Sequence, residues 1–135
     1  MPNTIRLEIA TPEAMVYSED VDMVTLPGVE GQMGVLPQHV RLITQLVPGE
    51  LIVHLSGHDD FMAVGEGLVE VTNERVSIVT NMAIAVDKID EAAVEEARQR
   101  AAARLREKIS SEEVASVNAS LARSLAQLNV KRRHR

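Results

Sequence analysis

Residues 76–105 read VSIVTNMAIAVDKIDEAAVEEARQRAAARL, and the spacing of their apolar residues changes partway along. In the opening VSIVT, apolar residues recur at every second position, which is typical of a β-strand. In the later VEEARQRAAARL they recur at spacings of three and four, which is typical of an amphipathic helix. The sequence therefore predicts two domains, a β domain over residues 1–86 and a helical domain over residues 87–135.

Short alternating runs continue the strand pattern back to the N-terminus. They cover residues 5–9, 21–26, 51–55, 61–64, 68–71 and 76–79. Pro27-Gly28 is expected to end the second run, and the polar residues 56–60 and 72–75 are expected to form hairpin loops. Many short strands joined by such turns predict an antiparallel sandwich or barrel, in which each sheet has one face in water.

Two helix starts are visible after residue 88. Asp90 is a candidate N-cap, flanked by an apolar pair, Ile89 and Val94, at staple spacing. Ser110 is a second candidate N-cap, with Glu113 placed to complete a capping box. The apolar stripes are Val94, Ala97, Ala101, Leu105 and Ile109, and then Val114, Val117, Leu121, Leu125 and Leu128. We expect two helices of about 19 residues, each roughly 28 Å long, turning back on each other with about one residue between them.

One narrow apolar stripe on each helix buries little surface, so this hairpin is expected to need a further surface to pack on. That surface is either the β domain or another protein. After the second helix, Lys131-Arg132-Arg133-His134-Arg135 is expected to form a basic tail.

Composition excludes several classes of protein. The 135 residues include no cysteine, which removes disulfides, thiolate metal sites and cysteine nucleophiles, and their only aromatic residues are Tyr17 and Phe61. This scarcity argues against recognition of nucleic acid by base stacking. No run approaches the roughly 20 apolar residues of a membrane span, and the N-terminus lacks the features of a secretory signal, so we expect a soluble, intracellular type of protein.

Catalytic and metal-binding patterns are poor. His54 and His58 are placed in a strand and its loop, where their spacing does not bring two metal ligands together, and no metal site is expected. Asp59 and Asp60 are adjacent, so they do not converge on one substrate. The glycine-rich residues 28–34 lack the Lys-Ser/Thr of a phosphate-binding loop. The sequence therefore predicts that the chain is not an enzyme.

Charge divides the chain at the same boundary as periodicity. Residues 1–87 hold 3 arginines and 13 acidic residues, whereas residues 88–135 hold 11 basic and 7 acidic residues. Arg100, Arg104 and Lys108 are spaced to form one row on the first helix. The row is either a solvated face or a surface for an acidic partner; a net charge of −6 and the lack of aromatics argue against nucleic acid.

Several motifs resemble those of one family. They are Gly31-Gln32-Met33-Gly34-Val35-Leu36-Pro37-Gln38-His39, then Leu42-Ile43-Thr44 with Pro48-Gly49, then Gly65-Glu66-Gly67-Leu68-Val69-Glu70-Val71, and finally Ile89-Asp90-Glu91 before the helices. In this order they resemble the epsilon subunit of the bacterial F-type ATP synthase, called delta in mitochondria. The resemblance spans essentially the whole chain.

The resemblance implies a β-sandwich of about ten strands followed by a helical hairpin. It also implies a non-catalytic rotor subunit of the central stalk, peripheral to the cytoplasmic face of the bacterial cell membrane, with no cofactor of its own. Its partners would be the gamma subunit, the c-ring, and the catalytic beta and alpha subunits. By resemblance, contacts to gamma and the c-ring are expected at Gly31, Gln32, Gly34, Leu36, Pro37, His39 and Thr44.

The hairpin of this family can fold against the sandwich, or extend and inhibit ATP hydrolysis. The resemblance thus makes the acidic partner of Arg100, Arg104 and Lys108 a loop of beta. The alternative from composition is a stand-alone basic-helix module that binds nucleic acid or an acidic protein. Some relatives bind regulatory ATP through an Ile/Leu-Asp-x-x-Arg-Ala motif. Here Ile89 and Asp90 are present, but Ala93 replaces the arginine, so the ATP motif is degenerate. Gln32 and Asn81 also stand where relatives commonly have acidic residues.

Overall fold

The computed structural model describes residues 3–134, which form ten strands, one 3₁₀ helix and two α-helices. The strands are β1 (Ile5–Ala10), β2 (Met15–Val21), β3 (Met23–Gly28), β4 (Gly31–Val35), β5 (Leu42–Leu46), β6 (Gly49–Leu55), β7 (His58–Val64), β8 (Gly67–Val71), β9 (Arg75–Thr80) and β10 (Ala83–Ala85). The helices are η1 (Val86–Lys88), α1 (Glu91–Leu105) and α2 (Ser111–Arg133).

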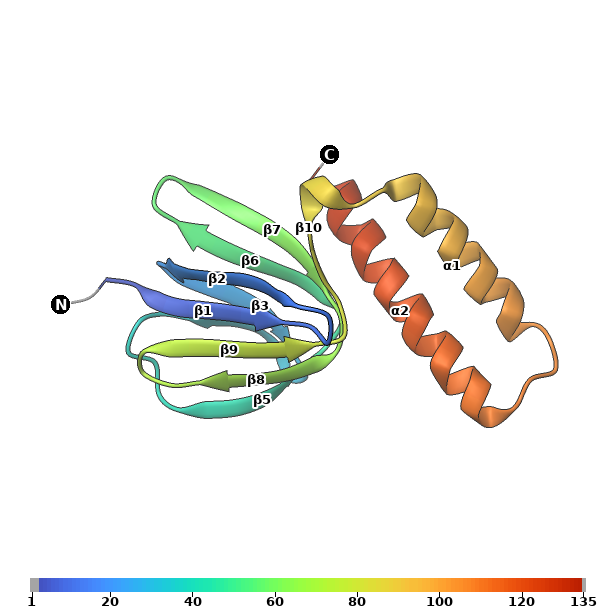
Figure 1. The fold of residues 1–135 in the computed structure, drawn as a ribbon, viewed down its shortest axis with the longest axis horizontal. Coiled ribbons are helices and arrows are strands. Elements are labelled where there is room, and N and C mark those ends of the chain that lie inside the picture. The colour runs from blue at the N-terminus through green and yellow to red at the C-terminus, as the bar shows by residue number, and fades with distance from the viewer. Residues whose placement is uncertain (1–2, 135) are drawn as a thin grey trace.

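The strands form a β-sandwich with the hairpin standing beside one end of it, which confirms the predicted fold (Figure 1). Neighbouring strands follow the order β10-β7-β6-β3-β5-β8-β9-β1-β2, and β4 pairs with β3 at the side. The sheet is not wholly antiparallel as predicted, because β1 and β9 pair in parallel, with Leu7 opposite Val76. These two strands come from opposite ends of the domain, so no hairpin turn imposes an antiparallel orientation on them.

Aliphatic side chains alone fill most of the sandwich core. In β1, the residues Ile5, Leu7 and Ile9 are buried and alternate with half-buried residues, as the period of two predicts. One cluster of sixteen buried residues extends from Ile5 to Ile78. The core of the sandwich is therefore made without any residue of the hairpin.

Two predicted strand boundaries are wrong. Residues 21–26 are not one strand, because Asp22 separates β2 from β3 and donates its backbone N–H to His54 O at 2.9 Å. The predicted loop 56–60 is shorter, because Gly57 adopts a φ of +90° and lets Ser56-Gly57 turn the chain in two residues. His58, Asp59 and Asp60 consequently belong to strand β7.

The hairpin is less symmetric than predicted. α1 has 15 residues and α2 has 23, with residues 106–110 between them, instead of two equal helices and a one-residue turn. The N–H groups of Arg106 and Glu107 donate to carbonyls three residues back, which tightens and ends α1 before Ile109. The Asp90 N-cap is confirmed, since its carboxylate accepts the Ala93 N–H at 3.1 Å.

The second capping box is only half formed. Ser110 Oγ accepts the Glu113 N–H at 3.2 Å, which confirms the predicted N-cap. The Glu113 carboxylate does not return to Ser110, because it pairs with the Arg104 guanidinium at 2.5 Å. An ion pair across the tip of the hairpin thus replaces the reciprocal hydrogen bond.

α2 has two packing faces where one stripe was predicted. Ser124, Ala126, Leu128 and Val130 are buried, whereas Leu125, which the stripe included, is exposed. The reason is that α2 lies between α1 and the sandwich and contacts β6, β7 and η1, while α1 lies on its outer side (Figure 1). Val130 joins Ala63 and Ile89 in a small buried cluster that connects the hairpin to the sandwich.

Candidate interaction surfaces

The predicted contact residues from Gly31 to His39 lie along β4 and in the loop after it, so the length of the strand separates them into two groups. Gly31 opens the strand with a φ of +121°, which favours glycine, and an added Cβ at Gly34 would collide with the methyl group of Met23. A strand advances about 3.3 Å per residue, so Gly31 and Leu36 lie roughly 16 Å apart. The segment therefore presents two surfaces, one at each end of β4.

The first of these surfaces faces the hairpin. Gln32 is exposed and lines a cleft of about 430 Å³ together with residues of α2, including Asn129 and Arg133. The Gln32 side chain brings hydrogen-bonding capacity without charge to this turn.

The second surface lies at the other end of β4. Gln38 has a φ of +64° and donates its N–H to Asn73 O at 2.9 Å, which holds the loop after β4 against the β8–β9 turn. His39, by contrast, keeps Nδ1 only 2.7 Å from the neighbouring Val40 carbonyl. Leu36, Val40 and Ile43 are exposed here, and we call them the distal apolar group.

Thr44 differs from the other predicted contact residues. It is half-buried and lies opposite Val69, a core residue, whereas Ile43 on the same strand is exposed. Because side chains alternate along a strand, Ile43 and Gln45 lie on the exposed face of β5.

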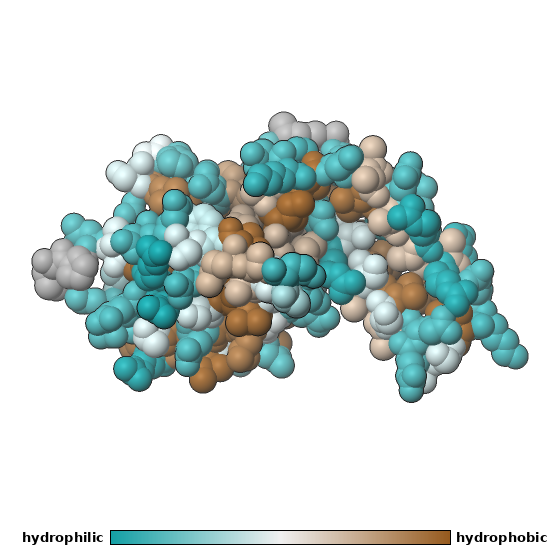
Figure 2. Space-filling view, viewed as in Figure 1, coloured by the Kyte–Doolittle hydropathy of each residue, from teal (hydrophilic) through white to brown (hydrophobic). Residues whose placement is uncertain are grey.

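Sequence reasoning missed a third surface, which crosses four neighbouring strands. Met15 lies opposite Ala10, Ala10 lies beside Val79, and Val79 lies opposite Leu68. Val79 is 61% exposed and Leu68 52% exposed, so the row is an open apolar strip on the outside of the sheet. We call Met15, Ala10, Val79 and Leu68 the apolar row. Figure 2 shows apolar surface gathered on the half of the sandwich nearer the hairpin.

A signal for the apolar row exists in the sequence. Leu68-Val69 and Ile78-Val79 are pairs of consecutive apolar residues in otherwise alternating strands. Because Val69 and Ile78 face the core, their apolar neighbours have to face outward. Exposed apolar patches of this kind commonly mark interaction sites.

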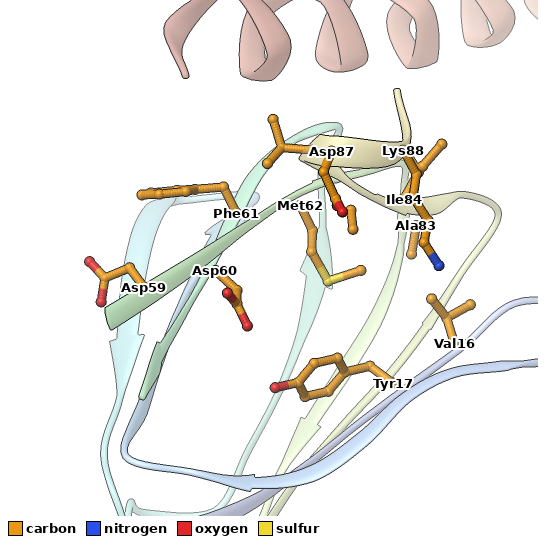
Figure 3. A pocket seen from close by; sticks show the side chains of 12 residues that line it. Val16, Tyr17, Asp59, Asp60, Phe61, Met62, Ala83, Ile84, Asp87 and Lys88 are labelled. Carbon is orange, nitrogen blue, oxygen red and sulfur yellow. The ribbon is translucent and has the colours of Figure 1, made fainter. Parts of the chain in front are cut away.

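A cleft of about 710 Å³ lies between β2 on one side and β7 and β10 on the other (Figure 3). Met62 and Tyr17 face this space, while the Asp59 carboxylate turns away from it (Figure 3). Burial, reinforced by the nearby Glu19 carboxylate, raises the pKa of the Tyr17 hydroxyl to about 12, so this hydroxyl is not a base at neutral pH. Apolar residues make up most of the cleft lining, together with the charged residues Asp59, Asp60, Asp87 and Lys88.

The two histidines of the β6–β7 hairpin each have a separate carboxylate. His54 Nδ1 lies 3.0 Å from Asp59, and His58 Nε2 lies 3.6 Å from Asp60. The Nε2 atom of His54 is also 2.8 Å from the Thr25 hydroxyl. Within residues 3–134, no group of three or more His, Cys, Asp or Glu side chains is arranged to hold a metal ion.

The predicted basic row is broken by the end of α1. Lys108 lies beyond Leu105, the last residue of α1, so it does not continue the helical row of Arg100 and Arg104. Arg104 is not an uncompensated charge, since it pairs with Glu107 and Glu113 at the hairpin tip. Both acids hold the pKa of Arg104 above its ordinary value.

The residues of the degenerate ATP motif make contacts within the chain. Ile89 is buried. The Asp90 carboxylate is the N-cap of α1 and accepts a hydrogen bond from the Ala93 N–H. Ala93 is exposed and has no polar side-chain group. The nearest downstream arginine, Arg98, donates to Glu95 from Nε at 3.0 Å and Nη2 at 2.5 Å, and these bonds help lower the pKa of Glu95 to about 2.

The basic C-terminal residues do not form a free tail as far as the structure describes them. Lys131, Arg132 and Arg133 still belong to α2, and each reaches a different element of the protein. Arg135 lies outside the described residues. Neither helix within residues 3–134 has the length and apolar character needed to cross a membrane.

A β-sandwich with exposed apolar strips, carrying a helical hairpin, offers several surfaces of the kind that bind other proteins. Family models identify this two-part architecture. The beta-sandwich domain of the ATP synthase delta/epsilon chain matches residues 4–86, and the long alpha-helix domain of the same chain matches residues 87–132. The chain belongs to the ATP synthase delta/epsilon family.

Individual relatives agree over nearly the full length. The ATP synthase epsilon chain of Herpetosiphon aurantiacus is 42% identical over 126 residues, covering 93% of each chain. That of Chloroflexus aggregans is 40% identical over 131 residues, covering 97% of this chain and 94% of the relative. Among solved structures, a chain of the Euglena gracilis mitochondrial ATP synthase, described as OSCP/F1/c-ring, aligns with a TM-score of 0.78 at 26% identity, covering 96% of this chain and 81% of that one.

Proposed function

We propose that this chain is a non-catalytic rotor subunit in the central stalk of a proton-transporting F-type ATP synthase. In that role it transmits rotation of the c-ring toward the catalytic head. The observation that carries the proposal is the family match over both the sandwich and the hairpin, in one unbroken order. The rigid aliphatic core suits the role, because a coupling element must transmit torque without deforming.

The apolar row is the proposed docking surface for the gamma subunit. Its members come from four adjacent strands, so together they form a firm strip with little conformational entropy to lose on binding. Fully burying a side chain such as Leu68 or Val79 contributes about 1.5–3 kcal/mol. A single charge placed in the strip would therefore remove much of the binding energy.

The two ends of β4 are the proposed contacts to the c-ring and to the remaining surface of gamma. Gly31, Gln32 and Gly34 lie at or near the hairpin-side turn, whereas Leu36, Pro37 and His39 lie with the distal apolar group. Thr44 is half-buried on β5, so its proposed role is to pack beneath these contacts and not to form a contact surface itself. Contact with the c-ring would hold the chain peripherally at the cytoplasmic face of the cell membrane.

The hairpin is the proposed regulatory element, which inhibits ATP hydrolysis when it leaves the sandwich and extends toward the catalytic alpha and beta subunits. Arg100, Arg104 and Lys108 would then meet acidic loops of beta. Arg100 and Lys108 are exposed in the folded hairpin, but Arg104 would first have to exchange its pairs with Glu107 and Glu113. With Ala93 in place of the motif arginine, we propose that ATP does not hold this hairpin closed.

Co-purification with gamma tests the proposal. The full chain is expected to retain gamma, whereas Leu68→Glu and Val79→Glu are expected to lower the affinity at least tenfold while leaving the circular dichroism unchanged. Ala103→Glu is the matched control, because Ala103 is an exposed apolar residue of α1 and lies outside the surfaces proposed to contact gamma and the c-ring. If the wild-type chain does not bind gamma but raises the fluorescence anisotropy of labelled DNA, the chain is better described as a stand-alone basic-helix module.

A further inference from the structure

The last four described residues each contact the protein at a different place. Lys131 Nζ donates to the Val86 carbonyl of η1 at 3.2 Å. Arg132 reaches α1, where it donates to Glu91 at 3.1 Å and to Glu95 at 3.3 Å. These contacts join the end of α2 to the start of the hairpin, so the two ends of the hairpin are fastened together.

Arg133 and His134 reach in the other direction, to the sandwich. Arg133 Nη1 donates to Glu50 Oε1 at 3.0 Å, and His134 Nε2 lies 2.5 Å from Glu50 Oε2. Glu50 lies on β6, eighty-odd residues away in sequence, and its side chain is only 9% exposed. Both of its carboxylate oxygens are therefore engaged by the C-terminal residues.

The His134 ring adds an apolar contact to the same site. It stacks on Phe61 of β7 with ring centroids 3.7 Å apart and planes 20° apart. Phe61 also packs against the small cluster that contains Val130, one turn back along α2. The polar and stacking contacts thus surround the point where α2 meets the sheet.

This arrangement is specific to the docked position of the hairpin. Lifting α2 would break both bonds to Glu50, the Phe61 stack and the Lys131 bond to η1 together. Hydrogen bonds to charged groups contribute more than neutral ones, although the Arg133 side chain is 60% exposed and its share is reduced by solvent.

We propose that residues 131–134 form a C-terminal latch, with Glu50 and Phe61 as its receptor, which holds the helical hairpin against the sandwich. The basic end of the chain is thus an intramolecular clamp in this state and is not available to an acidic partner. Under the proposed function, on which this consequence rests, releasing the latch would favour the extended, inhibitory hairpin.

Thiol labelling of the full chain measures the latch directly. Since the sequence has no cysteine, Val130→Cys provides a single thiol that is buried under the docked hairpin. Its labelling rate reports how often α2 lifts. We compare this background with Glu50→Gln, with Arg133→Gln/His134→Gln, and with all three changes together. Glu112→Gln is the matched control, because Glu112 is exposed and takes part in no described ion pair.

Glu50→Gln and the Arg133→Gln/His134→Gln pair are each expected to raise the labelling rate about tenfold. The combination should exceed neither by more than about twofold, since all of these changes break the same bonds. Glu112→Gln should have no effect, and hydrogen exchange of the β1 amides, which reports opening of the sandwich, should be unchanged in every variant.

Three results would overturn the latch: a labelling rate unaffected by Glu50→Gln, effects that multiply in the combination, or β1 exchange that accelerates as much as labelling. The last result would mean that Glu50 supports the whole fold and not the hairpin alone. The measurement needs no other subunit, so its failure would leave the proposed function standing, and failure to bind gamma would leave the latch standing.

Discussion

Cutting the chain after Val86 should leave a folded sandwich. The cut removes η1 after its first residue and the whole hairpin. All sixteen residues of the main core cluster lie between Ile5 and Ile78, so none of them is lost. The domain division at residues 86 and 87 is therefore proposed to be a division of stability as well as of sequence.

The size of the effect follows from what the hairpin covers. Phe61, Ala63, Ile84 and Val86 pack in the cluster beneath α2, and of these only Ala63 is fully buried even in the intact chain. Full burial of a large apolar side chain contributes about 1.5–3 kcal/mol, so the loss of partial burial at three of them should cost about 2–4 kcal/mol. For a domain of this size, that loss lowers the melting temperature by roughly 10–25 °C.

Circular dichroism and proton NMR of fragment 1–86 provide the assay, with the intact chain as reference. We expect dispersed amide signals, a β-type spectrum and one cooperative thermal transition. The companion fragment 87–135 should be largely unfolded, because its helices bury too little surface alone. An unstructured 1–86 fragment, or a stably helical 87–135 fragment, would contradict this division of stability.

Three further outcomes are expected. In the reconstituted complex, Arg100→Ala/Arg104→Ala/Lys108→Ala should relieve inhibition of ATP hydrolysis about tenfold at low salt and less at 1 M salt, where screening is strong, whereas Arg106→Ala should not; equal inhibition by all variants would make the row a solvated face. Calorimetry should detect no micromolar ATP binding to the isolated chain, and heat from such binding would contradict the role given to Ala93. The Glu95 ion pairs lower its pKa to about 2, so their stabilising effect should be complete above the ordinary value of 4.5 and disappear as the pH falls from 4.5 toward 2; helical circular dichroism should record this loss, and Glu95→Gln should reduce its dependence on pH.

Local patterns in the sequence are sufficient to predict a structural feature where one short-range interaction determines it. The alternation of Ile5, Leu7 and Ile9 predicted the buried face of β1, and Asp90 and Ser110 were recognised as N-caps. In each of these cases the deciding contacts lie within a few residues, so the sequence contains the necessary information.

Features that depend on distant contacts were not predictable in this way. The sequence signals that Leu68 and Val79 face outward, but their union with Ala10 and Met15 in one row needs four strands in register, and the parallel pairing of β1 with β9 has no local signal. The sequence predicts a basic tail at the C-terminus, because the receptor of these residues, Glu50, is more than eighty positions away. The difference in charge between the domains indicates separate partners. Some of these charges nevertheless pair with each other inside the chain, as Arg133 of α2 does with Glu50 of β6.

A single cysteine in the apolar row shows whether this surface docks on gamma in the assembled complex. Val79→Cys places a thiol on a side chain that is exposed in the isolated chain, and the natural sequence contains no other thiol. This thiol should react readily in the isolated chain, become protected in the assembled ATP synthase and be cross-linked to gamma. A cysteine in place of Arg106 in the hairpin loop should not be cross-linked to gamma in the folded state. A thiol at position 79 that reacts equally fast in the isolated and assembled states would rule out docking through the apolar row.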